Sequence, residues 1–406
     1  MINVIAKPIG PVCNLNCQYC YYLDKKKSLP KENSFVMDDE TLEEYIIKYF
    51  AAIPAHFSEI IFGWQGGEPT LLGIEFFEKV LLFQRKHNRL NKKIINSIQT
   101  NGTLINSDWA LFLCKNQFLV GISVDGPQEI HNFYRKNSKN EGTFLKVHNA
   151  IQCFNKYNVE YNTLVTVNNH NAGFPHKIYE YLKLTGSKYW QFIPVIEWQD
   201  TINVSPESLK PGQYSSFMIG IFEQWISKHD YNNIWIQLFY SLIGNCLGEP
   251  ATLCLYNQNC GRCLAIEHNG DVYSCDHYVY KEYLLGNIKN NNFTELMNTQ
   301  THLKFSSYKT NLPKNCNQCQ YLSYCYGGCP KHRTNQFDIP ENYLCYDYKT
   351  FFDYTIPTFK NMANCVIKNK PINPNGPTLT TSNNNRRNQK CSCGSGKKQK
   401  ACCLKL

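Results

Sequence analysis

The stretch of sequence that decides the fold is Cys13-Asn14-Leu15-Asn16-Cys17-Gln18-Tyr19-Cys20, in which three cysteines follow the spacing C-x3-C-x2-C. Three thiolates on so short a loop can hold three irons of a [4Fe–4S] cluster, whose full complement is four cysteines. The fourth iron then stays open to an outside ligand, and an open position is what catalysis at a metal requires. The alternative is a zinc loop that lacks one of its ligands.

A second motif, Gly66-Gly67-Glu68-Pro69-Thr70, directly follows an apolar run at residues 60–64. Paired glycines let the backbone approach a ligand closely, and Glu68 offers a carboxylate to an ammonium group. Alone, such a string is usually a turn. Downstream of the three-cysteine loop it indicates a binding site.

The first 230 residues alternate strand-like and helix-like segments. Repeated βα units predict an α/β fold with a parallel sheet, curled or doubly wound, and place ligands at the carboxyl ends of the strands. Strands are expected near residues 4–6, 60–62, 94–98, 119–124, 164–167 and 190–195, and helices near residues 40–51, 75–87, 107–115, 143–157, 177–184 and 213–228.

Together these motifs resemble the radical SAM superfamily, in which S-adenosylmethionine (SAM) chelates the open iron. The resemblance implies a partial (β/α)6 barrel of the TIM type and cleavage of SAM to methionine and a 5′-deoxyadenosyl radical. The cofactor carries the hard chemistry, and the protein orients it. Each SAM contact implied in this way also has an ordinary structural interpretation. The implied contacts are Gly66, Gly67 and Glu68, then Tyr19 and Ile196 at the adenine, Ser123, and Arg135 at the SAM carboxylate.

Residues 231–365 lose the alternation and gather cysteines. The order Cys260-x9-Gly270-x4-Cys275, Cys316-x2-Cys319-x5-Cys325-x3-Cys329, Cys345 resembles the SPASM extension of radical SAM enzymes, and Cys254 adds an eighth cysteine. Eight thiolates suit two fully ligated [4Fe–4S] clusters, although two structural zinc sites would use the same ligands. By resemblance, the first auxiliary cluster takes Cys254, Cys260, Cys275 and Cys329, and the second takes Cys316, Cys319, Cys325 and Cys345.

Cys263 is an alternative ligand of the first auxiliary cluster, because it lies three residues after Cys260. We prefer Cys260, which preserves the x9-Gly-x4 spacing. Asp276 directly follows Cys275 and could otherwise be an ordinary surface aspartate. By resemblance it is a catalytic base, and we expect a neighbouring anionic cluster to raise its pKa.

Residues 1–365 resemble the anaerobic sulfatase-maturating enzymes nearly throughout, most clearly at residues 65–70, 97–105, 118–127 and 270–276. These oxidoreductases convert a cysteine or serine of a nascent sulfatase to Cα-formylglycine. The resemblance implies that the radical takes a Cβ hydrogen, that Asp276 removes the thiol or hydroxyl proton, and that a cluster accepts the remaining electron.

The partners implied by this resemblance are an unfolded or nascent sulfatase and a low-potential donor of the flavodoxin or ferredoxin type. One alternative is another SPASM maturase, which forms thioether or quinone cross-links in a peptide. Many of those enzymes carry an N-terminal recognition domain, for which we expect no room before Cys13. A non-enzymatic zinc module would leave the glycine-rich motif and the open three-cysteine loop unexplained.

The charge is uneven along the chain. The net charge is +10, but residues 371–406 hold seven Lys or Arg and no acid, which leaves 35 basic and 32 acidic residues before them. The near-neutral body gives no reason to expect nucleic acid, and only the tail suits a polyanion. There is no run of 18 apolar residues and no secretory signal, so we expect a cytoplasmic protein without membrane contact, whose thiols are free for metals.

The end of the chain forms a separate unit. Residues 366–388 are rich in Pro, Asn, Thr and Ser and predict a flexible linker between residues 231–365 and residues 389–406. The pattern C-x-C-x8-C-C then resembles the SEC-C zinc motif, although incidental thiols on a disordered tail are the alternative. Four thiolates would close a structural zinc site, and we expect the unit to dock on a ribosome, chaperone or secretion partner. The four ligands are Cys391, Cys393, Cys402 and Cys403.

Overall fold

A curved sheet of ten strands organises the chain in the computed structural model, which describes residues 2–23, 25, 34–334 and 341–374. The tail cysteines Cys391, Cys393, Cys402 and Cys403 lie outside the described residues. The order across the sheet is β10-β9-β8-β1-β2-β3-β4-β5-β6-β7. The strands are β1 (Asn3–Lys7), β2 (Glu59–Trp64), β3 (Lys93–Thr100), β4 (Leu119–Ser123), β5 (Tyr161–Val167), β6 (Tyr189–Pro194), β7 (Trp235–Ile236), β8 (Cys263–Glu267), β9 (Asp271–Tyr273) and β10 (Leu284–Asn287).

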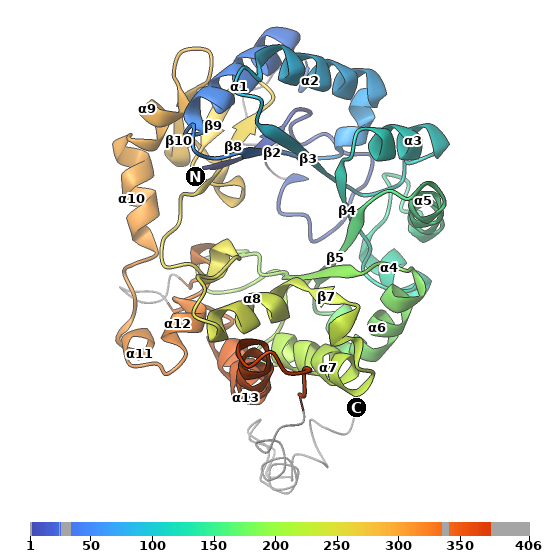
Figure 1. Cartoon of the computed structure of the whole chain (residues 1–406), viewed down its shortest axis with the longest axis vertical. Coiled ribbons are helices and arrows are strands. Elements are labelled where there is room, and N and C mark those ends of the chain that lie inside the picture. Colours follow the sequence, from blue (N-terminus) through green and yellow to red (C-terminus); the bar gives the residue numbers. More distant parts are fainter. Residues whose placement is uncertain (1, 24, 26–33, 335–340, 375–406) are drawn as a thin grey trace, which may run out of the picture.

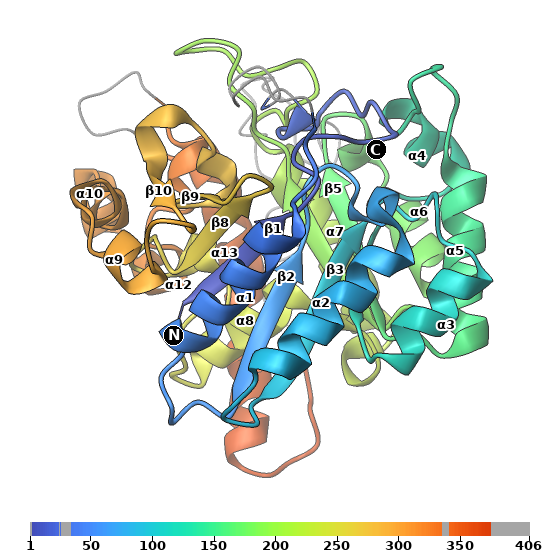
Figure 2. The same cartoon turned by 90° about the horizontal axis from the view of Figure 1, so that it is seen from above.

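Helices cover the outer face of this sheet, as Figures 1 and 2 show. Strands β1 to β7 are parallel, and helices connect most of them. The sheet stays open between β7 and β10, so the barrel is partial. The helices of the barrel are α1 (Asp39–Ala52), α2 (Gly73–His87), α3 (Ser107–Lys115), α4 (Gln128–Tyr134), α5 (Phe144–Tyr157), α6 (Pro175–Leu184), α7 (Gln213–Ser227) and α8 (Gln237–Cys246).

Strand β2 shows why the helices pack on one face only. Ile60, Phe62 and Trp64 are fully buried in the main core, where their rings and methyl groups meet the helices. Ile61 is largely exposed, and Gly63 has no side chain. Successive residues of a strand point to opposite faces, so the hydrophobic face lies under the helices and the other face lines the interior of the barrel.

The segment after residue 230 extends the same sheet. β8 pairs in parallel with β1, and Lys7 lies opposite Glu267 in the register. β9 and β10 continue the sheet by antiparallel pairing. The boundary expected near residue 230 is therefore not a break in the sheet. The remaining helices of this half are α9 (Phe293–Met297), α10 (Gln300–Tyr308), α11 (Lys314–Asn317), α12 (Leu322–Cys325) and α13 (Cys345–Ile367).

The expected α/β fold with a partial barrel is confirmed. Each strand and helix expected before residue 230 is present, with ends that differ by at most three residues. The largest difference is β5, which starts at Tyr161 rather than 164, because Tyr161 and Asn162 are half-exposed and carry no hydrophobic signal. Within the described part of the chain, no helix combines the length and apolarity that a membrane crossing requires.

Candidate active site

The three-cysteine loop lies beyond the carboxyl end of β1. Cys13, Cys17 and Cys20 are half-buried free thiols that interact electrostatically with one another. Burial raises the pKa of Cys13 to about 11 and that of Cys17 to about 12. Binding of a metal to such thiols releases their protons. The loop therefore fits an iron–sulfur cluster.

The glycine-rich motif is tied directly to this loop. The Gly67 N–H donates to the carbonyl of Gly10 at 2.8 Å, and the Glu68 N–H donates to the carbonyl of Val12 at 2.9 Å. A Cβ on Gly67 would come within 1.9 Å of the Val12 carbonyl oxygen. Only glycine allows this contact, so position 67 fixes how closely the two loops meet.

The Glu68 carboxylate is fully buried and largely occupied by the protein itself. Its Oε1 accepts hydrogen bonds from the Thr70 N–H (3.1 Å), the Thr70 hydroxyl (2.6 Å) and the Thr100 hydroxyl (2.7 Å), and its Oε2 accepts one from the Asn101 N–H at 2.7 Å. Burial raises its pKa, and these hydrogen bonds oppose the rise. Glu68 thus joins the ends of β2 and β3, and its Oε2 can still accept a bond from an ammonium group.

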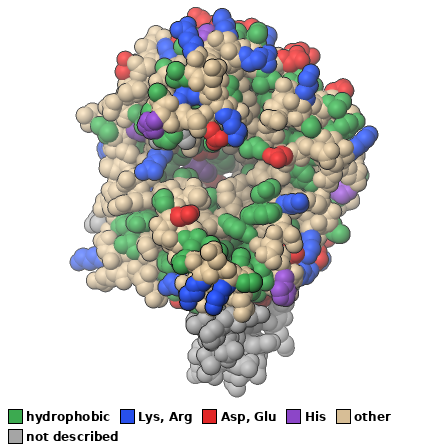
Figure 3. Space-filling view, in the orientation of Figure 1, with side chains coloured by type: hydrophobic (Ala, Val, Ile, Leu, Met, Phe, Trp, Pro, Cys, Tyr) green, Lys and Arg blue, Asp and Glu red, His purple; other side chains and the backbone are tan. Residues whose placement is uncertain are grey.

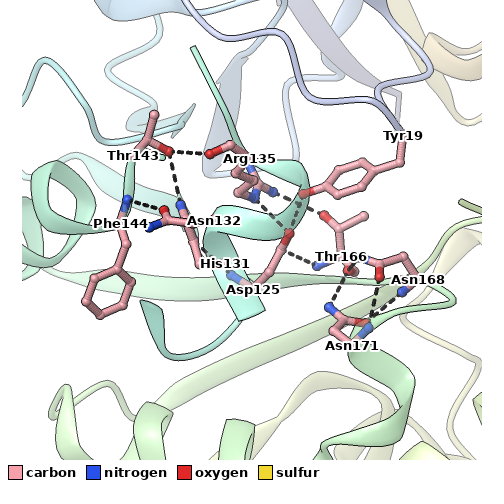
Figure 4. Close-up of polar contacts among 10 residues, drawn as sticks. All are labelled: Tyr19, Asp125, His131, Asn132, Arg135, Thr143, Phe144, Thr166, Asn168 and Asn171. Atoms are coloured by element: carbon pink, nitrogen blue, oxygen red, sulfur yellow. Dashed lines mark hydrogen bonds and ion pairs between the residues drawn. The ribbon is translucent and has the colours of Figure 1, made fainter. Parts of the chain in front are cut away.

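A buried carboxylate, Asp125, organises the opposite side of the site (Figure 4). Its Oδ2 accepts a hydrogen bond from the Tyr19 hydroxyl and lies 3.0 Å from Nε of Arg135. Its Oδ1 accepts from the Thr166 N–H at 3.0 Å. Arg135 also donates to the Thr166 hydroxyl at 3.2 Å. The network joins the cysteine loop to the ends of β4 and β5.

The expected SAM contacts fall into two groups. Tyr19 and Arg135 lie together, with the guanidinium carbon 5.5 Å from the tyrosine ring centre. Ser123 is the last residue of β4 and precedes Asp125 by two positions. Ile196 is buried in the main core, and its contact with SAM stays a prediction. Its neighbour Val195 packs against Tyr19, because consecutive residues at the end of a strand face opposite ways.

Asp276 approaches the cysteine loop from the far end of the sheet. The hydroxyl of Tyr21, which follows Cys20, donates to Oδ2 of Asp276 at 3.0 Å. The Tyr21 ring stacks on His277 with centroids 4.6 Å apart. The Asp276 carboxylate therefore lies between the first cysteine loop and Cys275, which directly precedes Asp276 in the sequence.

The raised pKa expected for Asp276 is wrong for this arrangement of residues. Burial raises the pKa, but the positive charges of His277 and Lys7 and hydrogen bonds from Tyr21 and Cys275 outweigh it, and the pKa falls to about 2. The sequence did not reveal these neighbours, since Lys7 and Tyr21 come from the other end of the chain. Asp276 is held as a carboxylate that accepts hydrogen bonds.

The eight cysteines of the second half fall into two groups. Electrostatic interactions link Cys254 with Cys260, Cys275 and Cys329. A second set links Cys345 with Cys316, Cys319 and Cys325, and all four of these line a hollow of about 30 Å³. Burial raises the pKa of thiols in both groups. These are the two ligand sets that the resemblance predicts, their role as cluster ligands stays a prediction, and binding of a metal would displace their protons.

Among the described residues, no three His, Cys, Asp or Glu side chains lie close enough to share one metal ion. A [4Fe–4S] cluster binds each thiolate at a separate iron and therefore tolerates wider spacing. Cys263, at the start of β8, interacts with Cys254 and Asp276, so it lies near the first quartet as a fifth thiol.

A cavity of about 980 Å³ lies mainly against the starts of β4, β5 and β6, and Gln65, which follows β2, also lines it. Figure 3 shows the molecule hollowed near the centre of this face. Uncharged polar side chains and aromatic rings both line the cavity, together with the charged residues Glu160 and Lys188. Gln65, which precedes the glycine-rich motif, belongs to both the cavity and the site. The polar lining includes Gln65, Ser97, Gln99, Asn162, Gln191 and Gln237.

Several site residues were not predicted. Asp125 stands in a quoted motif, but nothing in the spacing pairs it with Arg135 and Tyr19. Glu267 is fully buried and accepts a hydrogen bond from the Tyr22 hydroxyl at 2.6 Å, and Lys7 lies 4.0 Å from the Tyr22 ring centre. A charged residue inside an apolar strand is the one signal that could have indicated Lys7 and Glu267.

Comparison with known proteins agrees with this geometry. Residues 8–182 match the radical SAM superfamily, and residues 254–320 match the iron–sulfur cluster-binding SPASM domain. A serine-type anaerobic sulfatase-maturating enzyme of Bacteroides thetaiotaomicron is 38% identical over 88% of this chain and 90% of its own. A cysteine-type enzyme of Clostridium perfringens is 39% identical over 89% and 98%.

A solved structure gives the same result. Native anSMEcpe with bound AdoMet and Cp18Cys peptide superposes with a TM-score of 0.83 and 38% identity, over 90% of this chain and 99% of that one. Fold and sequence thus agree over nearly the whole described chain. The chain belongs to the family of anaerobic sulfatase-maturating enzymes, radical SAM proteins with a SPASM domain.

Proposed function

We propose that this protein oxidises a cysteine or serine side chain of a sulfatase polypeptide to Cα-formylglycine without oxygen. The observation that carries the proposal is the position of Asp276, which bonds to Tyr21 beside the first cysteine loop and follows Cys275 of the first auxiliary quartet. A base, a radical source and an electron acceptor are the three parts that such an oxidation needs.

The first cluster is proposed on Cys13, Cys17 and Cys20. The auxiliary clusters are proposed on Cys254, Cys260, Cys275 and Cys329, and on Cys316, Cys319, Cys325 and Cys345. When bound, the first cluster and SAM supply the 5′-deoxyadenosyl radical that takes the Cβ hydrogen. A donor of the flavodoxin or ferredoxin type is proposed to supply electrons.

The chain's own residues would position the substrates and move the proton. Gly66, Gly67 and Glu68 are proposed to receive the amino end of SAM. The Oδ2 atom of Asp276, already an acceptor for Tyr21, is proposed to take the thiol or hydroxyl proton of the target residue.

The test is anaerobic incubation of the iron-loaded protein with SAM, dithionite and two sulfatase peptides that differ only in a cysteine or serine at the target position. Mass spectrometry should show an aldehyde at that residue in at least one peptide, together with 5′-deoxyadenosine. Thioether or quinone cross-links in place of the aldehyde would contradict the proposal. A peptide with alanine at the target position is the control.

Iron content tests the cluster assignment separately. The reconstituted protein should hold about twelve irons, and replacement of Cys13, Cys17 and Cys20 by Ala should remove about four of them together with all SAM cleavage. Stoichiometric zinc in place of the auxiliary irons, in a protein that does not cleave SAM, would contradict it.

A further inference from the structure

Lys309 is a buried cation with no acidic partner. It follows α10 and is fully buried. Its Nζ donates to the carbonyl oxygens of Cys254 at 3.1 Å and Leu255 at 2.7 Å. Over the residues that the structure describes, Lys309 forms no ion pair with a carboxylate. A buried ammonium without a counter-charge destabilises the fold, so this position requires another source of negative charge.

The groups near Lys309 that would carry negative charge, as thiolates of a bound cluster, are cysteines. Its electrostatic partners are the thiols of Cys260, Cys329 and Cys254, which belong to the first auxiliary quartet, and of Cys325, which belongs to the second. The same four thiols each experience Lys309 as a stabilising positive charge. Lys309 therefore lies between the two quartets and acts on both.

Arg333 is a second buried cation that, like Lys309, donates to backbone carbonyls. It is 4% exposed, and its guanidinium donates to the carbonyl oxygens of Tyr308, Lys309 and Asn311 at 3.0 to 3.3 Å. Its charge reaches Cys260 of the first quartet and Cys316 of the second. A Cβ on Gly327 would come within 2.9 Å of the guanidinium, so that glycine leaves room for it.

We propose that Lys309 and Arg333 are the shared counter-cations of the two auxiliary iron–sulfur clusters and that they raise the reduction potentials of both. The inference rests on the proposed function only through the assignment of the eight cysteines to clusters. Net charge around a cluster is one of the factors that set its potential. Reduction adds one electron to a centre that is already anionic, so a fixed cation nearby stabilises the reduced form.

Lys309 and Arg333 would affect the reaction by favouring electron uptake at the auxiliary clusters. Oxidation of the target residue releases one electron in addition to the hydrogen atom and the proton. A higher potential at the auxiliary quartets favours its capture. Lys309 and Arg333 are thus positioning residues, since they act through the clusters and need not touch the substrate.

The test is a redox titration followed by electron paramagnetic resonance. The full-length protein with Cys13, Cys17 and Cys20 replaced by Ala gives signals from the auxiliary clusters alone. Lys309→Met removes the charge at similar length, and Lys309→Arg keeps it. Lys92→Met is the matched control, because Lys92 is also buried and also donates to backbone carbonyls, those of Pro54 and Phe57, and none of its hydrogen bonds to described residues reaches the cysteine-bearing segments.

Lys309→Met should shift the auxiliary potentials downward, so that at a fixed solution potential the ratio of reduced to oxidised cluster falls about tenfold. Lys309→Arg and Lys92→Met should leave that ratio nearly unchanged. Unshifted potentials with full iron content in Lys309→Met, or an equal shift in Lys92→Met, would overturn the proposal.

Iron loss in the variants is also decisive. If Lys309→Met cannot hold the auxiliary irons while Lys309→Arg can, the positive charge is required and the proposal stands. If both lose them, side-chain shape matters rather than charge, and the proposal fails. The titration uses neither SAM cleavage nor a peptide, so its result is independent of whether formylglycine is formed.

Discussion

Asp276 accepts a hydrogen bond from Tyr21 and stays ionised beside His277 and Lys7. Asp276→Asn keeps the size of the side chain but is a far weaker base. We expect SAM cleavage to persist and formylglycine to fall by roughly two orders of magnitude or more, the effect of losing a positioned base.

The measurement for Asp276→Asn compares 5′-deoxyadenosine with aldehyde by mass spectrometry, with deuterium at the substrate Cβ to follow hydrogen transfer. Asp200→Asn, on an exposed loop, serves as the control. A full yield of formylglycine from Asp276→Asn would place the base elsewhere, and Gln65 and Tyr22 would be examined next.

Gly67 offers a second test at the residue scale. Gly67→Ala would bring a methyl group within 1.9 Å of the Val12 carbonyl, so the cysteine loop and the glycine-rich loop must separate. We expect the variant to lose most SAM binding and part of its first-cluster iron. Gly173→Ala, where nothing lies within 4 Å, should behave like the unaltered protein. Iron content and SAM equilibrium binding measure the difference.

The sequence allowed the cysteine loop and the glycine-rich motif to be predicted, because their chemistry depends on residues close together in the chain. The Asp125–Arg135 ion pair could not be predicted, since it forms only when the ends of two strands and a helix meet. The pKa direction of Asp276 was wrong for the same reason. Its charged neighbour Lys7 is remote in sequence.

Helix α4 contains a buried histidine, His131, which makes the stability of the folded protein depend on pH. Nδ1 of His131 accepts a hydrogen bond from the Asp125 N–H at 3.3 Å, and its Nε2 faces the Thr143 hydroxyl at 3.2 Å. Burial, followed by the charge of Arg135, lowers its pKa well below 6.5. The unfolded chain therefore binds more protons than the folded one as pH falls below about 6.5, so acid destabilises the fold.

When the pH falls from 7 to 5, His131 should lower the free energy of unfolding of the cluster-free protein by about 2 kcal/mol. In His131→Asn, thermal unfolding should depend less steeply on pH. His332, whose pKa burial lowers to about 3, acts with the same sign and should keep some dependence. His56→Asn, at an exposed site, should retain the full slope. An unchanged slope in His131→Asn would contradict the assignment.

At the scale of elements, periodicity predicted the barrel strands and helices because each buries one face within its own segment. It did not predict that β8 joins β1. That pairing links residues about 260 positions apart in the chain, and no local pattern in either strand specifies its partner.

For the whole molecule, the tail gives a separable prediction. The described body ends with α13, which packs on α7 and α8, and the basic segment follows it. Truncation after Lys370 should leave turnover of a short sulfatase peptide intact. If Cys391, Cys393, Cys402 and Cys403 bind zinc, the truncated protein should lose about one tightly bound zinc per chain. Metal analysis and peptide turnover measure the two effects independently.

An inactive or insoluble truncation would show that the tail belongs to the catalytic body. A Lys390→Ala full-length variant, which alters the basic tail but none of its cysteines, should keep both zinc and activity.

The pairing of β1 with β8 also has a consequence for synthesis. β1 leaves the ribosome first, yet its partner residue for Lys7 is Glu267, about 260 residues later. At ordinary translation speeds, one edge of β1 stays unpaired for roughly 13 to 50 s until β8 has been synthesised. During that time it exposes unpaired backbone next to three reactive thiols, and exposed strand edges promote aggregation. Protein yield in cells should therefore depend on chaperones that cover this edge during translation.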